Sequence, residues 1–194
     1  MTTTREKLLD VAADLFYTQG FQSVGIDQIY GQVGITKTAF YKHFESKDDL
    51  IIAVLNRRDQ RELEEWGNYI RIRGRDDSRR QLSAFFELLE EWFSKPDFRG
   101  CFFLNALTEF PNENDPINRA ARAHGEHLAS MMLRFAAAAG ADDPAALTQQ
   151  LMLLITGAIS SRHRTGDLGA AKTATRVAHV LIETHCGRAA LTAR

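Results

Sequence analysis

The chain of 194 residues is poor in cysteine and has no long hydrophobic run. Its two cysteines, Cys101 and Cys186, are too few for a disulfide framework, which favours a reducing, cytoplasmic compartment. The most apolar stretch, residues 151–159, is far shorter than the ~20 residues that a membrane-spanning helix needs. We expect no signal peptide, because charged residues appear at the start of the sequence in place of the apolar core that a signal peptide has. We therefore expect a cytoplasmic protein without membrane contact.

An excess of charge of either sign is also absent, because 24 basic residues stand against 25 acidic ones. Bulk electrostatics therefore gives the protein no general attraction for polyanions. The first fifty residues even hold five basic and seven acidic residues. Three of those five basic residues, together with His43, fall between positions 37 and 47. Because only the face that meets phosphates must be positive, this placement matters more than the total.

No segment alternates apolar and polar residues with the period of two that strands show. Apolar residues recur instead at spacings of three and four, and the four prolines fall at plausible helix boundaries. The pattern predicts an all-α protein of about nine helices. We expect them at 4–19, 26–33, 37–44, 46 to beyond 66, 81–93, 100–110, 116–139, 144–163 and 167–185.

These helices divide into a small N-terminal group and a larger C-terminal bundle. We expect an N-terminal domain over residues 2–62 and a second domain over residues 63–194. The polar run 71–80, which contains Gly74, is interpreted as a solvated loop. Helix N-caps are expected at Thr3, Ser46 and Asp143.

Residues 25–44 fit a helix-turn-helix, a pair of short helices joined by a tight turn. Gly34 stands where such a turn needs a left-handed residue, which glycine adopts at no steric cost. Apolar residues on both predicted helices can hold the pair together. They are Ile26, Ile29 and Val33 on the first helix side and Ile35, Phe40 and Phe44 on the second.

The second helix of this pair carries polar residues that we expect to contact DNA. Thr36 is the expected N-cap of this helix, and the amide groups behind Thr36 can face a phosphate. Lys37 and Thr38 lie in the first turn, which reaches base edges in such motifs. Tyr41 can contact a phosphate or a thymine methyl group. Three further residues, Lys42, His43 and Lys47, can neutralise the DNA backbone.

Residues 36–50, TKTAFYKHFESKDDL, resemble the signature of the TetR/AcrR family of regulators. Members of that family end the recognition helix in an aromatic-Tyr-x-His-Phe run that is followed by Ser-Lys and acidic residues. The resemblance covers roughly the first sixty residues, and Tyr30 departs from it, because relatives carry a small or aliphatic residue there. Residues 99–111 are similar to a subgroup of uncharacterised members.

The resemblance implies a C-terminal domain whose middle helices enclose a pocket for a small-molecule effector. The aromatic-rich region 85–110 is first of all a core, and part of it is expected to line that pocket. The candidate ligand contacts are Phe86, Trp92, Phe102, Asn105, Glu109 and His127.

The resemblance also implies that the last two helices pair with a second subunit in a four-helix bundle. A homodimer would place two recognition helices about one helical turn (~34 Å) apart on a palindromic site in double-stranded DNA. Apolar and small residues on both predicted helices permit this pairing. They are Leu147, Leu151, Leu154, Ile155, Ala158, Ile159, Leu168, Ala171, Ala174, Ala178 and Leu181.

A metal site built from His124, His127 and Cys101 is conceivable, but the spacing is not that of an established metal motif. The ordinary interpretation is two half-exposed histidines and an inert core thiol in an apolar helix. The sequence also shows no set of nucleophile, base and acid, and no phosphate-binding loop. We therefore expect no metal, no cofactor and no enzyme activity.

The sequence thus predicts a ligand-responsive transcriptional repressor that binds DNA as a homodimer. Two alternatives stay open at this point. One is a helical enzyme or ligand carrier that keeps the N-terminal domain passively. The other is a protein-interaction module whose helix-turn-helix no longer binds DNA, which the acidic balance of the first fifty residues permits. The operator, the target genes, the effector and the direction of regulation do not follow from the sequence.

Overall fold

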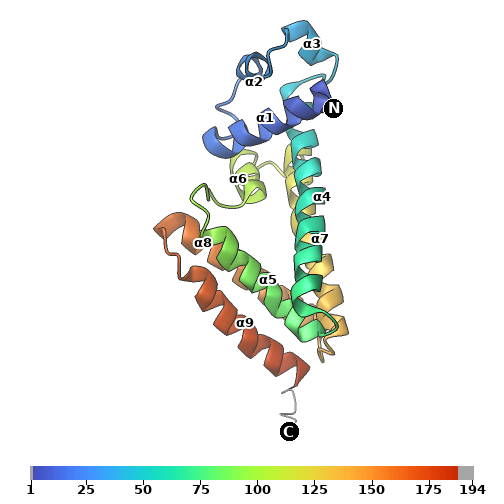
Figure 1. Cartoon of the computed structure of the whole chain (residues 1–194), viewed down its shortest axis with the longest axis vertical. Helices are drawn as coiled ribbons and strands as arrows, with labels where there is room; N and C mark the ends of the chain where they lie inside the picture. Colours follow the sequence, from blue (N-terminus) through green and yellow to red (C-terminus); the bar gives the residue numbers. More distant parts are fainter. Residues whose placement is uncertain (1, 188–194) are drawn as a thin grey trace. The chain divides into compact units, whose positions relative to one another are not determined.

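A computed structural model describes residues 2–187, and within this range every regular element is a helix. This confirms the predicted all-α class. The nine helices of the described residues (Figure 1) are α1 Thr4–Gln19, α2 Ile26–Val33, α3 Lys37–Tyr41, α4 Lys47–Gly74, α5 Ser78–Phe93, α6 Phe102–Glu109, α7 Pro116–Ala138, α8 Pro144–Thr165 and α9 Ala170–Cys186.

Several helices begin at the residues that the sequence predicted as caps. Thr3 and Glu6 form a reciprocal capping box at the start of α1. Ser46 accepts a hydrogen bond from the Asp49 amide at 3.0 Å, immediately before α4. Asp143 accepts one from the Ala146 amide at 2.9 Å, with proline at the first position of α8. The local signals for these helix starts are therefore confirmed.

Three predicted boundaries are wrong. The expected loop 71–80 is mostly helix, because α4 continues to Gly74 and Asp77 caps a new helix by accepting from the amides of Arg79 and Arg80. The second helix of the motif ends at Tyr41 and not at residue 44. The segment expected to be helical from residue 100 starts at Phe102, because Gly100 has φ +85° and cannot belong to a right-handed helix.

The described residues form two compact units. The first contains residues up to 61 together with 101–124, and the second contains 62–100 together with those from 125 onward. Helices α4 and α7 therefore contribute to both units. The expected division of the chain after residue 62 stays a prediction, and the sequence did not indicate that segment 101–124 packs with the N-terminal helices.

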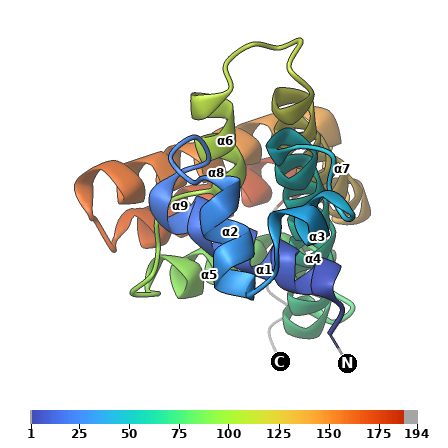
Figure 2. The ribbon, with the colours of Figure 1, turned by 90° about the horizontal axis from the view of Figure 1, so that it is seen from above.

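The core of the first unit is built from the aromatic and aliphatic faces of α1, α2, α3, α6 and the starts of α4 and α7. Phe21 stands at its centre, with its ring 5.2 Å from that of Phe16 and 4.8 Å from that of Phe102. Tyr30, the departure from the family pattern, packs half-buried against this core. Figures 1 and 2 show α2 lying over α1 within this unit.

The first unit also buries one polar pair. The Nδ1 atom of His124 on α7 lies 2.8 Å from Oδ1 of Asp59 on α4, and both residues are more than nine-tenths buried. The expectation of a half-exposed His124 is therefore wrong, because a buried imidazole is acceptable once it has a polar partner. His127, one turn further along α7, is exposed.

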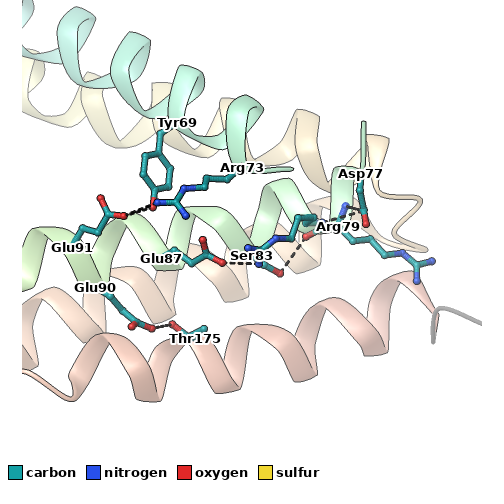
Figure 3. A network of polar contacts seen from close by, with 10 residues as sticks. Tyr69, Arg73, Asp77, Arg79, Ser83, Glu87, Glu90, Glu91 and Thr175 are labelled. Atoms are coloured by element: carbon teal, nitrogen blue, oxygen red, sulfur yellow. Dashed lines mark hydrogen bonds and ion pairs between the residues drawn. The ribbon is translucent and has the colours of Figure 1, made fainter. Parts of the chain in front are cut away.

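In the second unit α9 packs along α5 and α8. Figure 3 shows how carboxylates of α5 bind neighbouring helices on both sides. Glu91 accepts a hydrogen bond from the Tyr69 hydroxyl at 2.6 Å and pairs with Arg73 at 3.2 Å, both on α4. Glu90 accepts one from the Thr175 hydroxyl of α9 at 2.8 Å. Burial, and then the hydrogen bond to Glu91, raise the pKa of Tyr69 to about 12.

The end of α5 and the loop that follows it are each fixed to α8 by one contact of Arg162. Arg162 donates from Nε to the carbonyl oxygen of Phe93 at 3.1 Å, and its guanidinium lies 4.9 Å from the centre of the Phe98 ring. A Cβ at Gly100 would lie 2.8 Å from Nδ1 of His163. Glycine is therefore required at position 100 by both its positive φ and this close approach.

Both cysteines are free thiols. Cys101 is half-buried and stands one residue before α6 as its N-cap residue, so the expectation that it lies inside an apolar helix is wrong. Cys186 is buried at the end of α9, and this burial raises the pKa of its thiol. Nowhere in residues 2–187 is a helix both long and apolar enough to cross a membrane.

Candidate nucleic-acid interface

The turn between α2 and α3 has the geometry that a helix-turn-helix needs. Gly34 adopts φ +78° and ψ +34°, which is the left-handed region. Its amide donates to the carbonyl oxygens of Tyr30 and Gly31 at 3.0 and 3.1 Å, which closes the C-terminus of α2. A Cβ at Gly34 would meet nothing within 4 Å. The backbone conformation, and not a lack of space, therefore favours glycine here.

The inner face of the α2–α3 pair is apolar and buried. Ile29 and Phe40 are fully buried, and Phe44 follows with its ring 6.0 Å from that of Phe40. Half-buried Val33 and Ile35 pack around them. The pair is therefore held by its own apolar contacts, as the sequence predicted.

The outer face of α3 is polar and accessible. Thr36 caps the helix, with its hydroxyl oxygen accepting from the Ala39 amide at 3.2 Å. The Tyr41 ring stands edge-on to Phe40 at 5.3 Å and is 45% exposed, so it is anchored on one side and open to solvent on the other. Six of the seven predicted DNA-contact residues are exposed, namely Thr36, Lys37, Thr38, Tyr41, Lys42 and His43.

Lys47, the seventh predicted contact, is in a different environment. It is half-buried at the first position of α4, and its Nζ donates to the carbonyl oxygen of Gln22 at 3.1 Å. This burial lowers the pKa of Lys47, against the opposing effect of the Asp48 and Glu109 carboxylates. An ammonium group has three donors, so the hydrogen bond to Gln22 leaves donors for a phosphate.

Arg5 is a basic residue near this face that the sequence analysis did not include. It is exposed in the first turn of α1, and its guanidinium lies 5.0 Å from the centre of the Phe44 ring. The packing of α1 thus places another positive charge beside the end of α3. A basic residue near the chain start was visible in the sequence, but its nearness to Phe44 depends on tertiary structure.

Glu109, a predicted ligand contact, binds the turn between α1 and α2. Its carboxylate oxygens accept hydrogen bonds from the amides of Phe21 at 2.9 Å and Gln22 at 2.7 Å. The Gln22 side chain donates in return to the Glu109 carbonyl oxygen at 2.8 Å. This carboxylate is therefore engaged with the backbone of the first unit.

The other predicted ligand contacts are divided between the two units. Phe102 is buried in the core of the first unit, where half-buried Asn105 also lies on α6. Phe86 is buried on α5 in the second unit, and Trp92 is half-buried with its ring 5.0 Å from that of Phe98. The assignment of these residues and of His127 to an effector site stays a prediction.

The second unit carries an apolar groove of about 560 Å³ between α8 and α9. Leu153, at 77% exposure, is the most accessible of the large apolar side chains that line it. Leu147, Leu151 and Ile155, which the sequence analysis placed on the subunit-facing side of α8, are buried within the chain itself. The full lining is Gln150, Leu153, Leu154, Gly157, Ala158, Ser161, Asp167, Ala170, Thr173, Ala174, Val177 and Leu181.

Two family profiles match the chain, one over each part. Residues 8–54 match the profile "Bacterial regulatory proteins, tetR family", which covers the helix-turn-helix. Residues 78–178, more than half of the chain, match "Tetracyclin repressor-like, C-terminal domain". The chain belongs to the TetR family. The resemblance read from residues 36–50 is thereby confirmed.

Individual TetR-family proteins are similar over different shares of their length. A crystal structure of a TetR-family transcriptional regulator from Streptomyces coelicolor is 30% identical, with a TM-score of 0.86 over 94% of this chain and 96% of that one. The transcriptional activator FasR of Mycolicibacterium smegmatis is 34% identical over 92 residues, which are 44% of this chain and only 40% of FasR. The regulator YjdC of Escherichia coli is 21% identical over 80% of this chain and 81% of YjdC.

The family and the geometry agree on one conclusion. The described residues contain the paired helices, the left-handed glycine and the exposed polar face that a TetR-type helix-turn-helix presents. The protein is a TetR-family transcriptional regulator with a helix-turn-helix DNA-binding domain.

Proposed function

We propose that this regulator binds a palindromic operator as a homodimer, represses transcription there and is released by a small-molecule effector. The observation that carries the DNA-binding part is the exposed polar face of residues 36–43 on a buried apolar scaffold. In this proposal the protein acts in the cytoplasm, where the DNA lies, and performs no catalysis.

Each residue of the face has a proposed role. Lys37 and Thr38, in the first turn of α3, read base edges in the major groove. Tyr41 contacts a phosphate or a thymine methyl group with the exposed side of its ring. Thr36 positions the helix start against the DNA backbone. The phosphate contacts are Lys42, His43 and Lys47.

Fluorescence anisotropy with duplexes from the DNA flanking the protein's own gene tests this proposal. Lys42→Ala should weaken binding and reduce the dependence of log K on log salt by about 1, as expected for one lost phosphate contact. Tyr41→Ala should weaken binding as well. Lys95→Ala, which removes an exposed lysine of the second unit, is the matched control and should bind as the wild type does. Absence of binding at low salt would contradict the proposal and favour a protein-interaction module.

The apolar groove between α8 and α9 supports the homodimer. Leu153, Val177 and Leu181 line it and would leave apolar surface in water in a lone protomer. Ala158, Ala170 and Ala174 have small side chains, so a partner helix can approach closely. A second copy of the same face would cover this surface in a symmetric interface.

The direction of regulation needs its own test, because one relative, FasR, is named an activator. Deleting the gene should raise transcription of its target if the protein represses, and lower it if the protein activates. A melting-temperature screen with apolar small molecules should reveal effectors as stabilising ligands. The proposed contacts are Phe86, Trp92 and His127 in the second unit and Phe102, Asn105 and Glu109 in the first, and the alanine variants of each unit are tested as a separate set in the same screen.

A further inference from the structure

The turn that leads from α1 to the helix-turn-helix is held by two other helices of the first unit. Gln22 donates its amide to Oε2 of Glu109 at 2.7 Å, at the end of α6. Its side chain donates to the Glu109 carbonyl oxygen at 2.8 Å. From the start of α4, Lys47 donates to the Gln22 carbonyl oxygen at 3.1 Å. Three hydrogen bonds thus fix one exposed residue of this turn.

The turn is shaped around the Glu109 carboxylate. Its two oxygens accept from consecutive amides, those of Phe21 and Gln22, and hydrogen bonds to a charged acceptor are the stronger kind. Gly20 precedes them with φ +89°, and a Cβ there would lie 3.1 Å from Oε1 of Glu109. Glycine at position 20 therefore serves both the backbone conformation and the approach of the carboxylate.

We propose that Glu109 is a positioning residue of the helix-turn-helix. It holds residues 21 and 22, which lie five and four residues before the start of α2 at Ile26, and so sets where the α2–α3 pair is presented. This inference rests on the proposed DNA-binding function. Through Glu109, which is 87 positions from Gln22 in the sequence, helix α6 is connected to the turn that precedes the helix-turn-helix.

The direction in which DNA affinity changes when the charge of Glu109 is removed distinguishes a positioning role from a purely electrostatic effect. Glu109→Gln removes a negative charge, which by itself favours binding to phosphates. It also replaces one acceptor oxygen by an NH2 group that must face a backbone N–H donor. Positioning therefore predicts weaker specific binding, whereas electrostatics alone predicts tighter binding.

Glu113→Gln is the matched control. Glu113 lies in the same unit, pairs with Arg122 at 2.7 Å and is exposed, so the substitution changes the charge equally without touching the turn. Its binding should equal or slightly exceed that of the wild type.

Two measurements on the full chain test the inference. Hydrogen exchange should show faster exchange at the amides of residues 21 and 22 in Glu109→Gln than in the wild type and in Glu113→Gln. Anisotropy with a bound duplex from the gene's flanking DNA should show about tenfold weaker binding by Glu109→Gln. Binding to a random duplex of the same length should be unchanged or tighter.

Specific binding by folded Glu109→Gln that equals the wild type would overturn the inference and leave the proposed function intact. Failure of the wild type to bind any duplex would overturn the proposed function and the inference with it. If Glu109→Gln does not fold, Glu109→Asp decides, because it keeps the negative charge but shortens the side chain that reaches the amides of Phe21 and Gln22. A folded Glu109→Asp with wild-type specific affinity would then contradict the inference.

Discussion

The imidazole ring of His124 lies flat on the phenyl ring of Phe103, with 3.7 Å between the ring centres and 6° between the planes. The same imidazole contacts the Asp59 carboxylate at 2.8 Å. These contacts join α4, α6 and α7 within the first unit. Asp59 and His124 are both buried, so water has little access to either side chain. Each residue therefore gives the other a polar contact that solvent would not supply.

Asp59→Ala should therefore destabilise the protein. The substitution leaves the buried His124 without this partner, and such a loss costs about 1–3 kcal/mol of the free energy of unfolding. Urea denaturation at neutral pH measures it. Glu113→Ala, which breaks the exposed ion pair with Arg122, is the control and should cost clearly less. Equal losses in the two variants would contradict a structural role for the buried pair.

Gly100→Ala should be more damaging than Gly140→Ala. Both glycines lie in the second unit with positive φ, so an L-alanine costs about 1–2 kcal/mol of conformational energy at either site. Only at Gly100 does the new Cβ also meet a side chain, that of His163 at 2.8 Å. Adding His163→Ala to Gly100→Ala should recover stability in a double-mutant cycle of urea melts. Additive losses would show that the imidazole moves aside freely.

Tyr69→Phe should change how stability depends on alkaline pH. The folded protein raises the pKa of Tyr69 from 10.0 to about 12, so folding favours the protonated phenol. The stabilisation is complete below pH 10 and is lost as the pH rises through about 12. The difference in unfolding free energy between the wild type and Tyr69→Phe should therefore shrink over that range. A difference that stays constant to pH 12 would rule out this linkage.

Leu153→Glu should shift the proposed dimer toward monomers. Leu153 lines the groove between α8 and α9 and is 77% exposed in one chain. An unpaired carboxylate buried in the interface should raise the dimer dissociation constant about a hundredfold. Ile72→Glu, at an equally exposed apolar residue outside the groove, is the control. Sedimentation velocity over a dilution series measures both, and a Leu153→Glu protein that dissociates like the wild type would place the interface elsewhere.

Local signals in the sequence predicted the helix starts and the helix-turn-helix well. The caps at Thr3, Ser46 and Asp143 depend on side chains that bond backbone groups three residues away. The exposed and buried faces of residues 36–44 follow from spacing along a helix, and Gly34 follows from turn chemistry. In each case the partners are close neighbours in the chain.

The errors and omissions arise where neighbours in space are distant in sequence. The run 71–80 looked like a loop because it is polar, but α4 can keep charges on its exposed side as far as Gly74 while Ile70 is buried. The hydrogen bonds of Glu109 to the turn between α1 and α2 are an omission, because the sequence analysis considered this residue only as a candidate effector contact. Its amide partners lie 87 and 88 residues away, and no local pattern indicates them.

At position 34 the choice of residue is limited by the left-handed backbone conformation and not by the size of the side chain, because the surroundings of Gly34 are empty. Any L-residue there costs conformational energy because the backbone is left-handed, but its Cβ meets no neighbour within 4 Å. Asparagine, which visits that region most readily among the chiral residues, should be the mildest replacement, and a β-branched residue such as valine the worst. A D-alanine introduced by chemical ligation would adopt this backbone conformation without strain and would lower the conformational entropy of the unfolded chain. It should therefore stabilise the helix-turn-helix relative to glycine.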